Sequence, residues 1–403
     1  MAEAVAILAP DMGHGGSVGN VAWRHALVLG RSFRVYAIAR SFPPGVHPSV
    51  EAVPVRPATW NWLRRYCHVP NELSLLRALR RALADLCRRQ RIEVVWCHSH
   101  GIAARVAAPL RKRFGFRIVM TTHGDIFDRP AGTYSRELTR FYESVTPRAY
   151  READRVHALS PYMADLAVKG GASADRVRVV PNAVDPAEIG AQGLSPRAAA
   201  SFLEGGRLRL LYVGSLWSVK GVDVLMRSLA ELARGDRSAR VPTRAPGDVV
   251  LTLAGEGTQR QELEALAMAL GVSERVDFVG RVPRKDLSRC YRNADLLCIA
   301  SRSEAFSLVA VEAMHCGLPV VGSATGGIPS LVEPGFNGYL ATPGDPGSLA
   351  KAIATAAASR QHLAELGARG LQRARERYTW ERVGEELAEL ARSVLPARRR
   401  GGE

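Results

Sequence analysis

The stretch that decides the fold and the site spans residues 301–333 and reads SRSEAFSLVAVEAMHCGLPVVGSATGGIPSLVE. Its two glutamates, Glu304 and Glu312, lie eight residues apart. The apolar run 308–316 is typical of a helix that Gly317 ends, and Pro319 opens an apolar strand. We therefore expect Glu304 just before the helix and Glu312 one to two turns into it.

The helix start between the two glutamates has the chemistry of a phosphate site. Free backbone N–H groups at a helix N-terminus, here those of Phe306, Ser307 and Leu308, bind phosphate with help from the helix dipole. A carboxylate on either side can accept hydrogen bonds from sugar hydroxyl groups. We expect Glu312 to accept from a ribose and Glu304 from a transferred sugar.

Short apolar runs alternate with helical or loop sequence along the chain, which predicts parallel sheets covered by helices. The first series of expected strands covers residues 5–8, 33–39, 93–97 and 117–121. The second series covers residues 208–213, 249–254, 276–280, 296–299 and 319–322. The sequence therefore predicts an α/β protein of two doubly wound Rossmann-like domains, 1–187 and 188–375, with a helix and a basic tail over 376–403.

Positive charge is concentrated in the first domain. The chain has a net charge of +16, and residues 1–187 hold 27 Lys and Arg against 15 Asp and Glu, a net of +12. The expected helix over residues 74–91 places leucines on one face and arginines mostly on the others. Such a helix fits an anionic surface or ordinary solvent, and a general preference for Arg, with only five Lys in the chain, favours solvent.

The six cysteines form no C-x-x-C pair, which is typical of core residues in a reducing compartment. No run of about 18 apolar residues is present. Residues 1–10 have no basic segment before their apolar run, so we expect no signal peptide. We expect a cytoplasmic protein, with room for peripheral contact between its basic first domain and the inner face of an anionic membrane.

The segment 301–333 resembles the retaining glycosyltransferases of family 4, whose mark is E-x7-E, then G-x-P-V and a glycine pair. The matching positions here are Glu304, Glu312, Gly317, Pro319, Val320, Gly326 and Gly327. The resemblance implies the GT-B fold, in which two domains face each other across a cleft. It also implies a nucleotide-diphosphate sugar as donor substrate, UDP-sugars first, with retained configuration, no metal and no cofactor.

Other segments resemble the donor side of that family. Residues 213–221 match its G-R-L-x-x-x-K-G loop, so Lys220 would place a cation on the donor diphosphate. Ser215 stands where the family usually has Arg, and Arg281 could supply the missing charge. Residues 278–282, including Val282, match the segment whose backbone holds the base. Of these residues we expect Glu304 and Lys220 to be catalytic, and Glu312, Ser215, Arg281 and Val282 to bind the donor.

In the first domain, Gly15 and Gly16 resemble the family's first glycine loop, beside the diphosphate and the acceptor. His123 follows an expected strand, as does His100. By resemblance His123 contacts the donor sugar, so we expect it to be the third catalytic residue, and we expect His100 and Asp125 to bind the acceptor. The segment 181–185 resembles the linker between the domains, and Trp380 opens a helix like the one that crosses back to the first domain.

Two other classes remain open. A nucleotide-sugar epimerase or hydrolase-like enzyme would share the fold, and a non-catalytic basic protein would bind an anionic surface through the first domain. No RNA-recognition motif is visible, so we expect no nucleic-acid partner. The acceptor stays open between a lipid or glycan intermediate and a small natural-product or aminocyclitol aglycone.

Overall fold

The computed structural model describes residues 3–12, 17–45, 47–58, 69–98, 102–123, 136–234 and 249–396. The chain divides into two compact units, Met1–Asn182 with Glu381–Glu403, and Ala183–Trp380. The division falls before Ala183 rather than after residue 187. The segment after Ala183 belongs to the second unit because the Val184 N–H donates to the Tyr378 carbonyl.

The first unit is a seven-stranded sheet in the order β3-β2-β1-β4-β5-β6-β7, with every pairing parallel. Its strands β1 and β4 are buried at every position, as both-sided cover by helices requires. The strands are Ala4–Leu8 (β1), Arg34–Ala39 (β2), Val50–Pro54 (β3), Val94–His98 (β4), Arg117–Thr122 (β5), Arg155–Ala158 (β6) and Val177–Val179 (β7).

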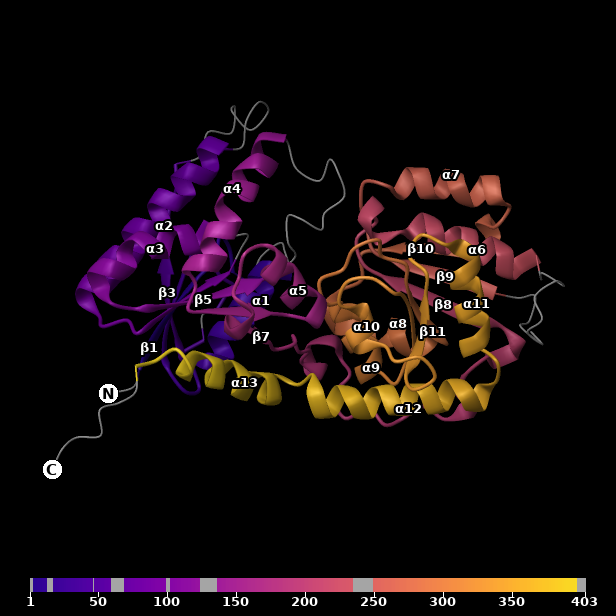
Figure 1. The fold of residues 1–403 in the computed structure, drawn as a ribbon. Helices are drawn as coiled ribbons and strands as arrows, with labels where there is room; N and C mark the ends of the chain where they lie inside the picture. Colours follow the sequence, from indigo (N-terminus) through magenta and orange to yellow (C-terminus); the bar gives the residue numbers. More distant parts are fainter. Residues whose placement is uncertain are drawn as a thin grey trace. The chain divides into compact units, whose positions relative to one another are not determined.

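Helices α2, α3 and α4 pack together against this sheet (Figure 1). The last helix, α13, also belongs to this unit from Glu381 onward, and its Arg392 lies over the Phe33 ring. The helices are Ser17–Leu29 (α1), Val69–Arg89 (α2), Ile102–Phe114 (α3), Arg136–Glu152 (α4), Pro161–Lys169 (α5) and Trp380–Arg392 (α13).

The second unit is a six-stranded parallel sheet in the order β10-β9-β8-β11-β12-β13. The strands are Leu208–Val213 (β8), Val249–Ala254 (β9), Val276–Gly280 (β10), Leu296–Ile299 (β11), Val320–Ser323 (β12) and Gly338–Ala341 (β13). The helices are Val222–Arg234 (α6), Arg260–Leu270 (α7), Leu287–Asn293 (α8), Leu308–His315 (α9), Ile328–Leu331 (α10), Pro346–Ala356 (α11) and Arg360–Arg377 (α12).

In both sheets the chain order reverses at one place, between β1 and β4 and between β8 and β11. Loops that leave the carboxyl ends of such neighbouring strands run in opposite directions and leave a crevice between them, which is where open α/β sheets bind ligands. In the second unit the two loops that flank this point carry Lys220 and Glu304.

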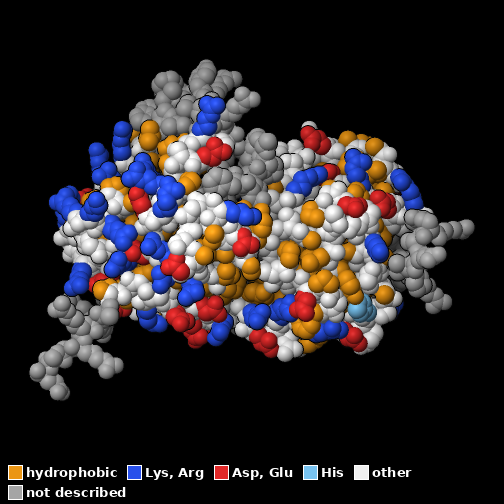
Figure 2. Space-filling model, viewed as in Figure 1, with side chains coloured by type: hydrophobic (Ala, Val, Ile, Leu, Met, Phe, Trp, Pro, Cys, Tyr) orange, Lys and Arg blue, Asp and Glu red, His pale blue; other side chains and the backbone are white. Residues whose placement is uncertain are grey.

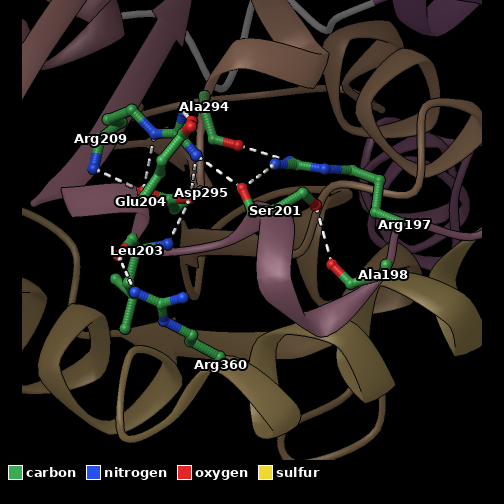
Figure 3. Close-up of polar contacts among 9 residues, drawn as sticks. All are labelled: Arg197, Ala198, Ser201, Leu203, Glu204, Arg209, Ala294, Asp295 and Arg360. Carbon is green, nitrogen blue, oxygen red and sulfur yellow. Dashed lines mark hydrogen bonds and ion pairs between the residues drawn. The ribbon is translucent and has the colours of Figure 1, made fainter. Parts of the chain in front are cut away.

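A buried carboxylate fixes the base of β8 and β11 (Figure 3). Asp295 is fully buried and accepts from the backbone N–H groups of Leu203 (3.0 Å) and Arg209 (2.8 Å) and from the Arg209 guanidinium (2.8 Å). Arg197 and Arg360 bind nearby carbonyls of the same segment. The strands that lead to Lys220 and Glu304 therefore start from one rigid network. No helix among the described residues combines the length and apolar composition that a membrane crossing requires.

Candidate active site

Lys220 and Glu304 form an ion pair at the switch point of the second sheet. Lys220 Nζ lies 2.7 Å from Glu304 Oε2, and the Ser301 hydroxyl donates to the same oxygen at 3.4 Å. The lysine side chain is 28% exposed and the glutamate side chain 16% exposed. The site therefore holds a cation and a carboxylate, both within reach of a ligand, where two parallel strands end.

The loops that carry this pair approach each other closely. Lys220 ends the 3-10 turn Ser218–Lys220, and Gly221 follows in a left-handed conformation. A Cβ at Gly221 would lie 2.0 Å from the Ala300 carbonyl oxygen, so only glycine fits. Arg302 binds both carboxylate oxygens of Asp223, at 2.9 and 2.7 Å, and clamps the loops together.

The glycine pair seats the backbone of Glu304. The Gly327 N–H donates to the Glu304 carbonyl at 2.8 Å. A Cβ at Gly326 would lie 1.8 Å from that carbonyl oxygen, and one at Gly327 would lie 2.4 Å from the Ala305 oxygen. The role of these glycines is thus close backbone approach, which brings the Glu304 side chain to the ion pair.

Helix α9 begins beside the pair. Ser307 precedes it with φ 88° and ψ 81°, a rare conformation for a residue with a side chain. The Ser307 hydroxyl is buried and has no hydrogen-bond partner in the part of the chain that the structure describes. Leu308 is the first helical residue and Phe306 is buried against the Tyr378 ring. Strain of this kind is typical of ligand sites.

Glu312 lies in the second turn of α9 and is only 2% exposed. The Tyr291 hydroxyl donates to its Oε2 at 2.7 Å, and Arg284 Nη1 lies 3.0 Å from its Oε1. Burial raises the pKa of the Glu312 carboxyl, and Arg284, followed by Tyr291, opposes that rise. Neither partner was anticipated from the sequence.

Two further loops complete the carboxyl edge of this sheet. A Cβ at Gly255, after β9, would lie 1.7 Å from the Gly214 carbonyl oxygen, so the loops after β8 and β9 touch. Ser215 is half-buried in the first of them, and its carbonyl accepts from the Tyr212 hydroxyl at 2.7 Å. Loops at this edge of an open parallel sheet lie where such folds bind ligands.

The loop after β10 carries Arg281 and Val282. Arg281 is exposed and makes no ion pair with any described residue, and Val282 is half-buried. The arginine that does reach the site is Arg284, on the next turn. Arg284 lies in the 3-10 turn Arg284–Asp286 and Tyr291 in the short helix α8 that follows, and no motif in the sequence marks either residue.

In the first unit, His123 follows β5 and meets His98 at the end of β4. Their ring nitrogens, His98 Nδ1 and His123 Nε2, lie 2.8 Å apart. The rings of His25 and His157 complete a buried cluster. Burial lowers the pKa of His98 well below its usual value, and His25 is the largest further cause. His98 is therefore neutral near pH 7.

Four residues expected at the site lie outside the described residues: Gly15, Gly16, His100 and Asp125. Of the expected residues that the structure describes, Lys220, Glu304 and Ser307 meet at one edge of the second sheet, and Glu312 lies one turn further along α9. His123 belongs to the other unit.

Solved structures share this fold over nearly the whole chain. Sucrose-phosphate synthase from Thermosynechococcus elongatus matches with a TM-score of 0.77 at 22% identity, over 97% of this chain and 99% of that one. The Anabaena protein HepE in complex with UDP-glucose matches with a TM-score of 0.71 at 22% identity, over 98% and 100%. By fold the chain is therefore of the GT-B class.

Sequence comparison gives the family. Residues 15–188 match the model of Glycosyltransferase Family 4, and residues 198–373 match that of Glycosyl transferases group 1. The D-inositol 3-phosphate glycosyltransferase of Saccharomonospora viridis is 30% identical over 308 residues, 74% of this chain and 70% of that protein. The chain belongs to the family 4 glycosyltransferases, as the motif around Glu304 and Glu312 predicted.

The relatives are longer than the matched region. The D-inositol 3-phosphate glycosyltransferase of Nocardia farcinica is 35% identical over 248 residues, which are 60% of this chain but only 53% of the relative's own length. For that of Salinispora tropica the identity is 32% over 308 residues, 73% of this chain and 62% of the relative.

Proposed function

We propose that the chain transfers a hexose-type sugar from a UDP-sugar to an acceptor hydroxyl group, with retained configuration and without a metal ion. The ion pair between Lys220 and Glu304, beside the first turn of α9, carries the proposal. It offers a cation for the diphosphate and a carboxylate for the sugar hydroxyls at one place. The neighbouring Ser307 hydroxyl gives the same place a buried donor.

In the proposed reaction the bond between the sugar C1 and the diphosphate oxygen breaks, and its electron pair leaves with UDP. Lys220 and the first-turn N–H groups of α9 stabilise the negative charge that develops. The acceptor oxygen forms its bond to C1 on the face that the diphosphate leaves. Its proton passes to the departing phosphate oxygen. The positive charges that a metal would otherwise supply come from Lys220 and the helix end.

A UDP donor is supported by the fold neighbours, one of which holds UDP and UDP-glucose in its crystal structures. A thermal-shift screen of UDP, GDP, ADP and TDP tests this choice. A ligand at about 100 times its Kd stabilises the folded chain by about 2.7 kcal/mol, so UDP should raise the melting temperature most. A larger shift with another nucleotide would show that the donor base is not uracil. No shift with any of the four nucleotides would contradict the proposed donor site.

For the acceptor we propose a phosphorylated polyol of the inositol phosphate class. Support comes from the relatives' names and from the net charge of +12 over residues 1–187. Mass spectrometry of UDP-glucose or UDP-N-acetylglucosamine incubated with inositol 3-phosphate, inositol and glycerol 3-phosphate tests it. Transfer to inositol 3-phosphate is expected, in the presence of EDTA as in its absence, and proton NMR should give an α-glycoside.

The same incubation separates the alternatives. UDP released with free sugar and no acceptor indicates a hydrolase-like enzyme, and a changed sugar on intact UDP indicates an epimerase. Glu304→Gln should abolish transfer without unfolding the chain, because it keeps the shape but loses the charge that pairs with Lys220. Full activity in Glu304→Gln would remove this carboxylate from the mechanism.

A specific surface of the first unit supports a second partner, an anionic membrane. Figure 2 shows Lys and Arg side chains gathered over the face formed by α2 and α3. Two neighbouring grooves, of about 390 and 300 Å³, lie there. Apolar floor residues and arginines line them together, and we call the following set the arginine surface: Arg77, Arg80, Arg81, Arg88, Arg105 and Arg113.

Charge complementarity favours lipid phosphates as the occupant. Arg77, Arg80, Arg81 and Arg105 are exposed and form no ion pair with any carboxylate in the described ranges. Arg88 pairs with Asp85, the one acidic residue among the described residues that line the two grooves. A juxtamembrane cation contributes about 1 kcal/mol to binding an anionic surface, and salt screens it. The apolar groove floor would meet the acyl boundary.

Vesicle sedimentation tests the membrane contact. The chain should bind vesicles with 30% phosphatidylglycerol in low salt, but not pure phosphatidylcholine. The triple variant Arg77→Gln, Arg80→Gln, Arg81→Gln should lose binding, and the matched triple at the exposed Arg178, Arg227 and Arg289 should keep it. Equal loss of vesicle binding in both triple variants would show that net charge, and not the arginine surface, causes the binding.

A further inference from the structure

The carboxylate of Glu312 is almost completely buried and accepts hydrogen bonds from two side chains. Its side chain is 3% exposed, and the Tyr291 hydroxyl that donates to Oε2 is fully buried. The other donor, Arg284, is charged and 49% exposed. An unpaired buried carboxylate would take up a proton rather than stay charged. The arginine is therefore the group that lets Glu312 remain ionised.

We propose that Arg284 is a positioning residue of the donor site, which holds Glu312 as a carboxylate with its remaining lone pairs available to the ribose of the nucleotide sugar. This inference rests on the proposed function and on the expectation that Glu312 accepts hydrogen bonds from that ribose. An ionised carboxylate offers about four acceptor sites, and Tyr291 and Arg284 use two. The other two match the two hydroxyl groups of a ribose diol.

The local structure directs Arg284 to this task. Strand β10 ends at Gly280, whose left-handed conformation (φ 70°) turns the chain. The 3-10 turn Arg284–Asp286 then packs against the turn Pro186–Ile189, and Arg284 Nε lies 3.5 Å from Glu188 Oε2. Arg284 thus bridges two carboxylates, Glu188, which is half-buried, and Glu312, which is buried. The half-buried carboxylate orients the guanidinium, and the buried one receives its Nη1 hydrogen bond.

The charged and titratable groups that act on Glu312 are few. Arg284 comes from the turn after β10, Tyr291 from α8, and Cys316 from the end of α9 itself. Burial raises the pKa of Tyr291 well above its usual value and that of Cys316 to about 12, so both stay neutral near pH 7. Arg284 is the one cation that opposes the raised pKa of Glu312 among these groups.

The sign of the pH effect follows. Without Arg284 the pKa of Glu312 moves further up, so Glu312 takes up its proton at a higher pH than in the unaltered chain. A protonated carboxyl loses one acceptor site and its charge, and donor binding weakens. Donor affinity of the unaltered chain should depend less on pH over that range, since Arg284 opposes the rise in the pKa of Glu312.

Calorimetric titration with UDP-glucose, whose diphosphate diester does not titrate between about pH 5.5 and 8.5, measures this directly. Arg284→Gln should raise the Kd more near pH 6 than near pH 8, by no more than about tenfold for one unit of pKa shift. Arg284→Lys should recover part of the affinity. Arg289→Gln, at an exposed arginine of α8 that forms no ion pair with any described residue, is the matched control and should behave as the unaltered chain.

Saturating donor should restore kcat in Arg284→Gln, because the residue acts on the ribose carboxylate and not on the transferred sugar. Glu312→Gln separates this inference from the proposed function. If Glu312→Gln binds UDP-glucose normally, the ribose role itself fails. If Glu312→Gln loses affinity while Arg284→Gln keeps the Kd and the pH profile of the unaltered chain, Arg284 has no positioning role.

Discussion

Replacing Lys220 with alanine removes the cation that the structure places 2.7 Å from Glu304. In the proposed donor complex this cation would face the departing diphosphate, where the loss of one preorganised donor costs about 10²–10³ in kcat, or about 2.7–4 kcal/mol. The folded state should lose less than about 1 kcal/mol, because the Lys220 side chain is 28% exposed and solvent screens such pairs. Lys220→Ala should therefore be a folded, slow enzyme.

The assay is release of UDP in the presence of acceptor, followed at saturating donor, with melting temperature measured in parallel. Lys220→Arg should recover part of the rate, since it keeps a charge near the diphosphate. Lys351→Ala, an exposed lysine on α11, is the matched control and should leave kcat unchanged. A Lys220→Ala variant that turns over at the unaltered rate would refute the assignment of this cation.

Three further predictions concern the scaffold. Asp295→Asn should destabilise the chain by about 3 kcal/mol in urea unfolding, because it leaves the Arg209 guanidinium against a neutral buried partner. The free energy of unfolding of Ser307→Val should be about 1–3 kcal/mol lower than that of Ser307→Gly, because the left-handed backbone suits glycine and strains a branched side chain. Equal stability of the two variants would show that the backbone is not strained at this position. Burial lowers the pKa of His157 to about 4, below its value of about 6.5 in the unfolded chain. The stability that this neutral histidine contributes is present above about pH 6.5 and is lost as the pH falls through 4. The total loss is about 3 kcal/mol. In His157→Gln, the acid unfolding curve should be flatter over that window, and an unchanged curve would exclude this histidine as its cause.

The apolar runs of the sequence predicted most strands of both sheets, and the spacing of Glu304 and Glu312 predicted the pair of carboxylates. Strands with continuous apolar runs, such as β1 and β8, were predicted within a residue or two. The strands that were missed are short or half-exposed: β3, β6, β7 and β13. β7 has three residues and no buried position, so no apolar run marks it. Its place at the sheet edge comes from tertiary pairing with β6.

The contact between Lys220 and Glu304 spans 84 residues of sequence. It was foreseeable, because both residues follow strands that a doubly wound sheet places side by side. The partners of Glu312 were not, since Arg284 and Tyr291 come from a turn and a short helix whose approach depends on how α8 packs. The left-handed Ser307 is equally invisible in the sequence, because nothing in the residue type requires it.

A crystal structure of the chain with UDP-glucose tests the central claim most directly. The diphosphate should lie within hydrogen-bond distance of Lys220 Nζ and of the first-turn N–H groups of α9. The ribose should lie against Glu312, with Arg284 still paired to that carboxylate, and the glucose hydroxyls against Glu304. A nucleotide bound away from the ends of β8 and β11, or no nucleotide at millimolar concentration, would contradict the account.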